Sequence, residues 1–284
     1  MNTEQPRQLA HVRAAVYGQP WAITENGMRQ ILAVIEAHVQ GSQIDFQALA
    51  KKPEPSKDLG YDFQNNVAII PVCGPIFPKA NCMTDFSGAT ALSQVTQKMK
   101  SAKSQQPSAI ILDMDSPGGS VSGLADFCEW LQEFQSSAGF PVVSMTNPMC
   151  CSAAFMIAAS CTAAFSTSGG ITGSIGTVMA IDNYDRAERN AGNDSVVLRS
   201  SELKAIGNGS ISPNQIQELQ RMLMMHDAKF KQVVEQGRPK ADMSKVGTGQ
   251  VWHGVSANDQ PSALDLGLID GISTLEKLIE QFGN

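Results

Sequence analysis

The chain has 284 residues, of which 42% are hydrophobic and 17% charged; this is typical of a globular protein with one large domain or a domain with an extension. The formal net charge of −6 argues against nucleic acid as a partner. Neither an apolar run of about 18 residues nor the apolar region of a signal peptide occurs, so we expect a cytoplasmic protein with no membrane span.

The first 60 residues are predicted to form an N-terminal helical arm and linker. An apolar stripe at helical spacing predicts one amphipathic helix, and "GSQIDFQALAKKPEPSKDLG" is polar with two prolines, typical of a linker. Two interpretations of the arm stay open: a dispensable leader, or a docking arm for partner subunits. The stripe consists of Met28, Ile31, Leu32, Ile35 and Val39.

Residues 61–284 are predicted to form one domain in which strands and helices alternate. "NVAIIPVCG", "SAIILDMD" and "FPVVSMT" are rich in Ile and Val, as buried strands are. Apolar residues at helical spacing predict helices at 89–99 and 124–134. The stretch 147–161 is helix-like, "GSIGTVMAI" and "SVVLRS" add strands, and a capping box at Ser212 opens a long helix. The alternation predicts an α/β fold with largely parallel strands.

Ser152 is the one hydroxyl that stands out in the apolar stretch "NPMCCSAAFMIAASC". It can be a nucleophile or a small residue packed in the core, and the stretch alone does not decide between them. A nucleophile would need a base, an oxyanion hole and room for a substrate.

The motif "DMDSPGGSV" places a tight glycine turn between a predicted strand and a helix. Its two glycines, Gly118 and Gly119, allow positive φ and a close approach of the backbone. Their N–H groups would lie near a helix N-terminus, where negative charge is stabilised. This suits an oxyanion hole, although Pro-Gly-Gly alone is more often an ordinary turn. The second glycine run, "SGGITGSIGTV", lacks the spacing of nucleotide-binding loops.

The base is harder to find. His226 lies within the long amphipathic helix and His253 follows a tryptophan, and neither position is typical of a catalytic group. A lysine can replace histidine where burial keeps its amine neutral, and Lys204 follows the predicted strand "SVVLRS". Taken alone, Lys204 is most simply a solvated surface lysine.

The cysteines predict reduced thiols that act as small hydrophobic side chains, because most of them lie in apolar runs. They form no CxxC pair and the four histidines are scattered, so we expect neither a metal nor another cofactor. The six cysteines are Cys73, Cys82, Cys128, Cys150, Cys151 and Cys161.

Five motifs together carry a resemblance over roughly residues 66–280. "DMDSPGGSV", "CSAAFMIAAS", "TGSIGTV", "SSELKAIGNG" and "GQVWHG" with "ALDLGLID" occur in the order and spacing of the signal peptide peptidase A family of serine peptidases. The interval from Ser152 to Lys204 also suits that family. The arm, with "QPWAI", is similar to the branch of capsid assembly proteases from phages and prophages.

The resemblance implies a fold like that of Clp proteases and crotonases, with repeated ββα units. It implies Ser152 as nucleophile, Lys204 as general base and Ser174 as the residue that hydrogen-bonds the lysine amine. It also implies Gly119 as the oxyanion donor with Gly118 beside it. The sequence departs from the family at Gln250, often arginine there, and at the two neighbours of the serine, Cys151 and Ala153; these departures bear on specificity.

The implied function is a serine endopeptidase that cleaves peptide bonds, in the host cytoplasm or the procapsid. The candidate partners are capsid, scaffold or portal proteins, and a homo-oligomeric ring in which neighbouring protomers share active sites. Three alternatives are an inactive ring-forming structural protein of the same fold, a cellular soluble peptide peptidase, and an acyl-CoA enzyme. The last is disfavoured because we find no basic cluster for the CoA phosphates.

Overall fold

The computed structural model of the chain describes residues 16–39, 60–80, 84, 88–181, 190, 198–204, 206, 211–256 and 259–283. Among these residues, no helix is long and apolar enough to cross a membrane. The first 15 residues, and the predicted linker except its last residue, Gly60, lie outside the described part of the chain.

The larger of two sheets has the strand order β11-β10-β8-β6-β3-β2. Its centre, β3-β6-β8, is parallel, and the central strands are buried, which explains their runs of Ile and Val. Strand β9 pairs with β8 and β12. The strands are β2 (Asp62–Gln64), β3 (Val67–Cys73), β6 (Ala109–Ser116), β8 (Val142–Cys151), β9 (Ala163–Ser166), β10 (Ile171–Gly173), β11 (Val251–His253) and β12 (Gly271–Ile272).

The smaller sheet has the order β1-β7-β4-β5. A strand of the large sheet, a short strand of the small sheet and a helix follow one another twice, with β4 and α5 after β3, and with β7 and α6 after β6. The predicted α/β fold with repeated ββα units is therefore confirmed. The strands are β1 (Trp21–Ile23), β4 (Ile76–Phe77), β5 (Thr90–Ala91) and β7 (Gly118–Ser120).

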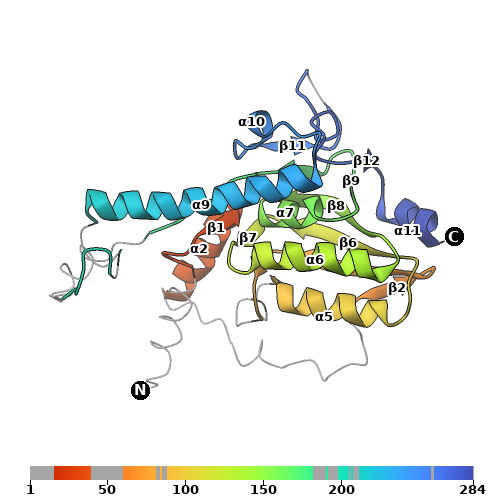
Figure 1. The fold of residues 1–284 in the computed structure, drawn as a ribbon, viewed down its shortest axis with the longest axis horizontal. Helices are drawn as coiled ribbons and strands as arrows, with labels where there is room; N and C mark the ends of the chain where they lie inside the picture. Colours follow the sequence, from red (N-terminus) through yellow and green to blue (C-terminus); the bar gives the residue numbers. More distant parts are fainter. Residues whose placement is uncertain are drawn as a thin grey trace.

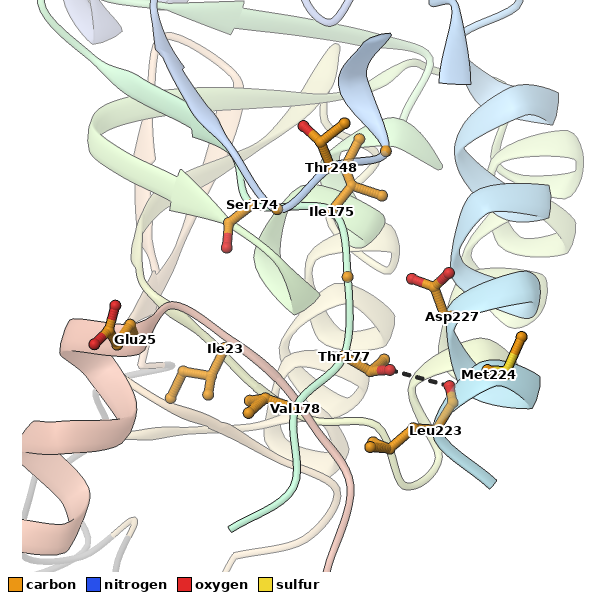
Figure 2. A pocket seen from close by; sticks show the side chains of 13 residues that line it. Ile23, Glu25, Ser174, Ile175, Thr177, Val178, Leu223, Met224, Asp227 and Thr248 are labelled. Carbon is orange, nitrogen blue, oxygen red and sulfur yellow. Dashed lines mark hydrogen bonds between the residues drawn. The ribbon is translucent and has the colours of Figure 1, made fainter. Parts of the chain in front are cut away.

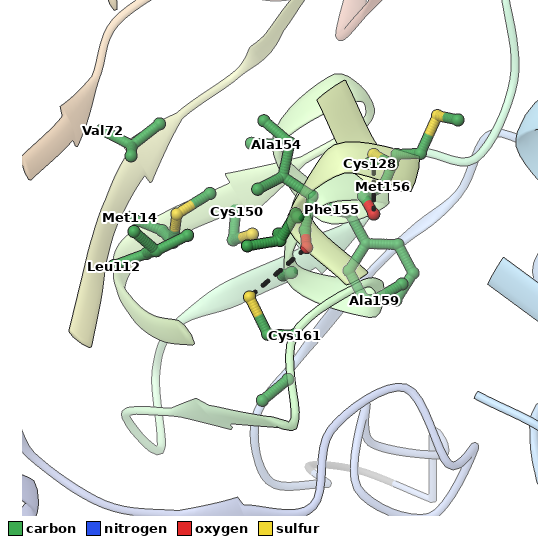
Figure 3. Packing of buried hydrophobic residues seen from close by; sticks show 14 of the residues in the cluster. Val72, Leu112, Met114, Cys128, Cys150, Ala154, Phe155, Met156, Ala159 and Cys161 are labelled. Carbon is green, nitrogen blue, oxygen red and sulfur yellow. Dashed lines mark hydrogen bonds between the residues drawn. The ribbon is translucent and has the colours of Figure 1, made fainter. Parts of the chain in front are cut away.

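Helices pack on both faces of the large sheet (Figure 1). The main core lies between the sheet and helices α5, α6, α7 and α9, and a smaller cluster lies under α11. Phe155 of α7 is fully buried at the centre of the main core, with Leu112 and Met114 of β6 in the same cluster (Figure 3). The helices are α2 (Glu25–Val39), α5 (Leu92–Lys103), α6 (Leu124–Ala138), α7 (Ala153–Ala159), α9 (Pro213–Gly237), α10 (Met243–Val246) and α11 (Leu275–Gly283).

Helix α9 begins with the predicted capping box, in which Ser212 Oγ accepts from the Gln215 N–H and the Gln215 side chain accepts from the Ser212 N–H. The N-terminal half of α9 projects beyond the rest of the molecule (Figure 1). At its other end, the buried Arg238 guanidinium pairs with Asp270 and donates to the Ala158 carbonyl. These bonds tie the ends of α7 and α9 to the C-terminal segment.

Three expectations about elements need correction. Residues 147–151 continue strand β8, and the helix begins only at Ala153. The strand in "GSIGTVMAI" ends at Gly173, beyond which Val178 forms an isolated bridge. Of "SVVLRS", residues 198–200 are not a strand, and the rest lies outside the described residues. The first difference arises because short apolar runs look alike as strand and helix.

Candidate active site

Ser152 occupies the turn between strand β8 and helix α7. It is fully buried, with φ 54° and ψ −117°, a conformation that L-residues rarely adopt. Such strain at a strand–serine–helix turn is typical of serine nucleophiles, because it turns the side chain out of both elements. The Ser152 Oγ atom has no hydrogen-bond partner, so the hydroxyl is not used for structure.

Backbone hydrogen bonds place Ser174 beside this turn. Strand β10 runs parallel to β8 with Gly173 opposite Cys151, and the Ser152 N–H donates to the Gly173 carbonyl at 2.7 Å. Ser174 follows directly, largely buried and also at positive φ, and its N–H donates to the Gln250 carbonyl at 2.6 Å. The structure therefore brings the two predicted serines together, on neighbouring strand ends.

The glycine turn lies against Ser152 as well. A methyl group added at Gly118 would lie 2.9 Å from Ser152 Cβ, and one added at Gly119 would lie 2.1 Å from the Ile76 carbonyl oxygen. Both positions therefore exclude any side chain. The Gly118 N–H donates to Ser116 Oγ at 3.2 Å, and Gly119 lies opposite Ala22 in the antiparallel pair of β7 and β1.

Lys204 is not brought to Ser152 within the chain. Its side chain is exposed and its N–H donates to the Ser201 carbonyl. Glu202 accepts hydrogen bonds from Ser212 at 2.7 Å and from Asn214 at 3.2 Å, which fixes this segment at the N-terminal end of α9. Figure 1 shows that end well away from α7.

The length of α9 gives an estimate of how far Lys204 lies from the main core that contains α7. The helix enters the main core through Phe230, Val233 and Val234 near its C-terminal end. At about 1.5 Å per residue, its first residue lies roughly 25 Å along the axis from that contact. Within one copy of the chain, Ser152 and Ser174 thus lie together while Lys204 lies far from both.

A cavity of about 450 Å³ adjoins Ser174. It is bounded by the arm, by the segment 174–178, by α9 and by the loop 247–249. Figure 2 shows the Ser174 hydroxyl pointing to the side of the cavity where Ile23 and Glu25 lie. Asp227 of α9 also lines it and pairs with Lys231. Of the two serines, Ser174 is among the residues that line the cavity.

The cysteines next to Ser152 are poor candidates for the nucleophile. Burial raises the pKa of the Cys151 thiol to about 12 and that of Cys150 well above its ordinary value, so both stay protonated at neutral pH. The cysteines that the structure describes are free, and no cluster of metal-ligating side chains occurs among the described residues.

Sequence reasoning missed two contributors. The sequence carries no signal for the role of Ser116, whose Oγ accepts from the Gly118 N–H and so orients the glycine turn. Strand β1 of the arm pairs antiparallel with β7, so that Ala22 lies opposite Gly119. The only signal for β1 was the short apolar run "WAI" before the predicted helix.

The fold and the site define an α/β protein of ββα units with a strained serine at a strand–helix turn, beside a glycine turn that excludes side chains. The model of peptidase family S49 matches residues 134–283, and the chain belongs to this family.

Relatives of known name agree with this assignment. The chain is 27% identical over 223 residues to capsid assembly protease C of Escherichia phage lambda, covering 72% of this chain and 50% of the relative. It is 26% identical to head-tail preconnector protein GP5 of Enterobacteria phage P21, covering 71% and 43%. It is 28% identical to the probable protease SohB of Haemophilus influenzae, covering 75% and 56%. The chain spans about half the length of these curated relatives.

Among solved structures, the chain is similar to a membrane-bound stomatin-specific protease, 1510-N, in complex with a substrate peptide. The TM-score is 0.44 at 15% identity, over 75% of this chain and 78% of that one.

Proposed function

We propose that the protein is a serine endopeptidase in which Ser152 is the nucleophile and Lys204 the general base. The observation that carries the proposal is the buried, unbonded Ser152 hydroxyl at a strained turn, against the glycines of β7. Ser174 lies where it can hold the lysine amine, and Gly119 supplies the oxyanion donor.

Lys204 reaches a Ser152 of a neighbouring copy of the chain. Because it lies at the projecting end of α9, it is far from its own serine but well placed to enter another subunit. Large apolar side chains are exposed next to the first residue of α9 and at the middle of the helix, as in a subunit contact. Leu203 is 49% exposed, Met224 72% and Met225 55%. This supports a homo-oligomeric ring with shared sites.

The reaction then follows the order of acyl transfer. The free lysine amine takes the proton from Ser152 Oγ as this oxygen attacks the scissile carbonyl carbon. The Gly119 N–H donates to the oxygen that becomes negative. The lysine ammonium gives the proton to the leaving amine, and an acyl-enzyme remains. Water, activated by the lysine, hydrolyses the ester and restores Ser152.

Phage capsid and scaffold proteins are the substrates we propose, in the host cytoplasm or the procapsid. The support is that two relatives are phage proteins, one printed as a capsid assembly protease and one as a head-tail preconnector protein. Incubation with capsid, scaffold and portal proteins, followed by mass spectrometry of the cut sites, tests this choice. Cleavage of general peptides alone would favour a cellular peptide peptidase instead.

Mixing two inactive variants tests the shared site. Ser152→Ala and Lys204→Ala should each abolish peptide cleavage, whereas Lys79→Ala, which alters another exposed lysine, should not. In a random one-to-one mixture, about a quarter of the sites of a closed ring combine an intact serine with an intact lysine from the next copy. The mixture should therefore regain about a quarter of wild-type activity.

Three outcomes contradict the proposal. Activity in Ser152→Ala would remove the nucleophile, and mixed oligomers without activity would restrict the dyad to one subunit. If the wild-type chain forms rings but never cleaves a peptide or reacts with a fluorophosphonate, the inactive structural protein is the better description.

A further inference from the structure

Strand β1 of the N-terminal arm lies directly over the candidate nucleophile. A methyl group added at Gly118 would be 2.2 Å from the Ala22 carbonyl oxygen, and 2.9 Å from both Ile23 Cα and Ser152 Cβ. The arm backbone and Ser152 Cβ therefore both lie within 2.9 Å of the position that a Gly118 side chain would occupy. The side chains of β1 are buried and Ser152 is fully buried too, so the arm forms part of the cover of the serine.

The arm also engages the proposed oxyanion donor. Strand β1 pairs antiparallel with β7, with Ala22 opposite Gly119. Two positions away on either side, the Thr24 N–H donates to the Pro117 carbonyl, and the Val121 N–H donates to the Pro20 carbonyl. Hydrogen-bonded pairs alternate along an antiparallel ladder, so the Gly119 N–H is directed at the Ala22 carbonyl.

The other edge of β1 is paired as well. The Trp21 N–H donates to the Val178 carbonyl and the Val178 N–H donates to the Trp21 carbonyl, both at 2.8 Å. Val178 belongs to the segment that follows Ser174 and lines the cavity. The arm thus lies as an extended strand between β7 and this segment, bonded on both sides. An extended peptide added to two open strand edges would lie in the same way.

Side chains hold the arm in this position through a small cluster of its own. Trp21 donates to the Val16 carbonyl at 2.9 Å and packs edge-on against Phe77. Trp21 and Ile23 belong to this cluster, whereas Ala22 is fully buried in the main core. The position whose carbonyl faces Gly119 is therefore filled by a methyl group in a closely packed space.

We propose that residues 21–23 are an internal occupant of the substrate position, so that the arm inhibits the peptidase until it moves away. The substrate that replaces it is an extended segment with a small residue, such as alanine, at the position of Ala22. The proposal rests on the peptidase function given above, because the occupied groups are its nucleophile and its oxyanion donor.

The test measures access to position 152 without any catalysis. In a chain with Ser152→Cys, and with Cys73 and Cys82 replaced by serine, the rate of alkylation by iodoacetamide reports how exposed residue 152 is. Ala22→Arg cannot fit in the space of a methyl group and should raise this rate at least tenfold. The control is Ala33→Arg, the same change at an exposed position of α2, which should leave the slow rate unchanged.

Equal rates in the parent chain, Ala22→Arg and Ala33→Arg would overturn the proposal, as would fast alkylation of the parent. Mass spectrometry separates release of the arm from unfolding, because the buried Cys150 and Cys161 react only if the fold opens. Should Ala22→Arg unfold the chain, Trp21→Ala loosens the arm through its own cluster and should raise the rate in the same direction.

A second readout separates this proposal from the peptidase assignment. With Ser152 intact, Ala22→Arg should increase peptide cleavage by the assembled protein several-fold. Faster alkylation without cleavage in any variant would leave the arm as a cover and remove the peptidase function. Equal cleavage by the wild-type chain and by Ala22→Arg, with faster alkylation when Ala22→Arg is present, would remove the inhibition and keep the peptidase function.

Discussion

Replacing Gly118 by alanine should destabilise the arm and the turn that carries Ser152. The residue has φ +109°, where an L side chain costs about 1–2 kcal/mol. The new methyl group would lie 2.2 Å from the Ala22 carbonyl oxygen, far inside ordinary contact. The arm backbone lies within 2.9 Å of the added methyl group and so does Ser152 Cβ, so we expect β1 to separate from β7 to relieve the clash.

The size of the effect follows from what β1 would lose. The ladder bonds from Thr24 to Pro117 and from Val121 to Pro20 contribute roughly 1 kcal/mol each. With the conformational cost, we expect the free energy of unfolding to fall by roughly 3–4 kcal/mol. Urea denaturation followed by tryptophan fluorescence measures this loss. Peptide cleavage should also fall, because the methyl group blocks a substrate strand as it blocks β1.

Gly139→Ala is the matched control, because Gly139 has φ +80° with nothing within 4 Å of an added methyl group. It should lose only the conformational part, about 1 kcal/mol, with unchanged cleavage. Equal losses of stability in Gly118→Ala and Gly139→Ala would refute the close approach of the arm to Gly118.

Two further predictions concern stability. Asp270→Asn removes the countercharge of the buried Arg238 and should lower the free energy of unfolding by roughly 3 kcal/mol, the lower end for a broken buried pair because Asp270 is half-exposed. Glu129→Gln breaks an exposed pair and should lower it by less than about 1 kcal/mol. Similar shifts of the thermal unfolding midpoint in the two variants would contradict this difference. Burial, and then Asp115, raise the pKa of Asp113, so its charged form destabilises the folded state at neutral pH, and this cost disappears as the pH falls through the raised pKa. Asp113→Asn should therefore raise the unfolding midpoint at pH 7, with a gain that shrinks in acid; a gain independent of pH would contradict the cause.

The sequence predicts the central strands and helices well because their burial leaves a clear pattern. Continuous runs of Ile and Val mark β3 and β6, and helical spacing marks α5, α6 and α9. Residues 147–151 were wrongly assigned because "NPMCC" has neither the alternation of a strand nor enough length to show helical period. The strand there is stabilised by its neighbours β6 and β10, which a local pattern does not contain.

In the candidate site too, the residues that follow a clear local pattern could be predicted and the others could not. Ser152 and the glycine turn could be picked out because each follows a buried strand, and parallel strands place their ends at one edge. Ser174 was assigned only through resemblance. The place of β1 depends on which strand edge it pairs with, and the role proposed for Lys204 depends on a neighbouring copy of the chain. Neither can be predicted from a local sequence pattern. A three-residue strand such as "WAI" carries no period that would indicate its partner.

Cleavage at Ser152 requires two changes, the arrival of a lysine and the movement of the arm. Lys204 lies far from Ser152 of its own copy, and the proposed oxyanion donor, Gly119, faces the arm. The cavity beside Ser174 is bounded by Ile23 and Glu25 of the arm and by Met224 of α9, so an entering lysine would approach past both. If assembly supplies the lysine and moves the arm, an isolated copy is inactive for two separate reasons. Removing the arm alone should then open position 152 to alkylation in the isolated chain, while cleavage still requires the assembled protein.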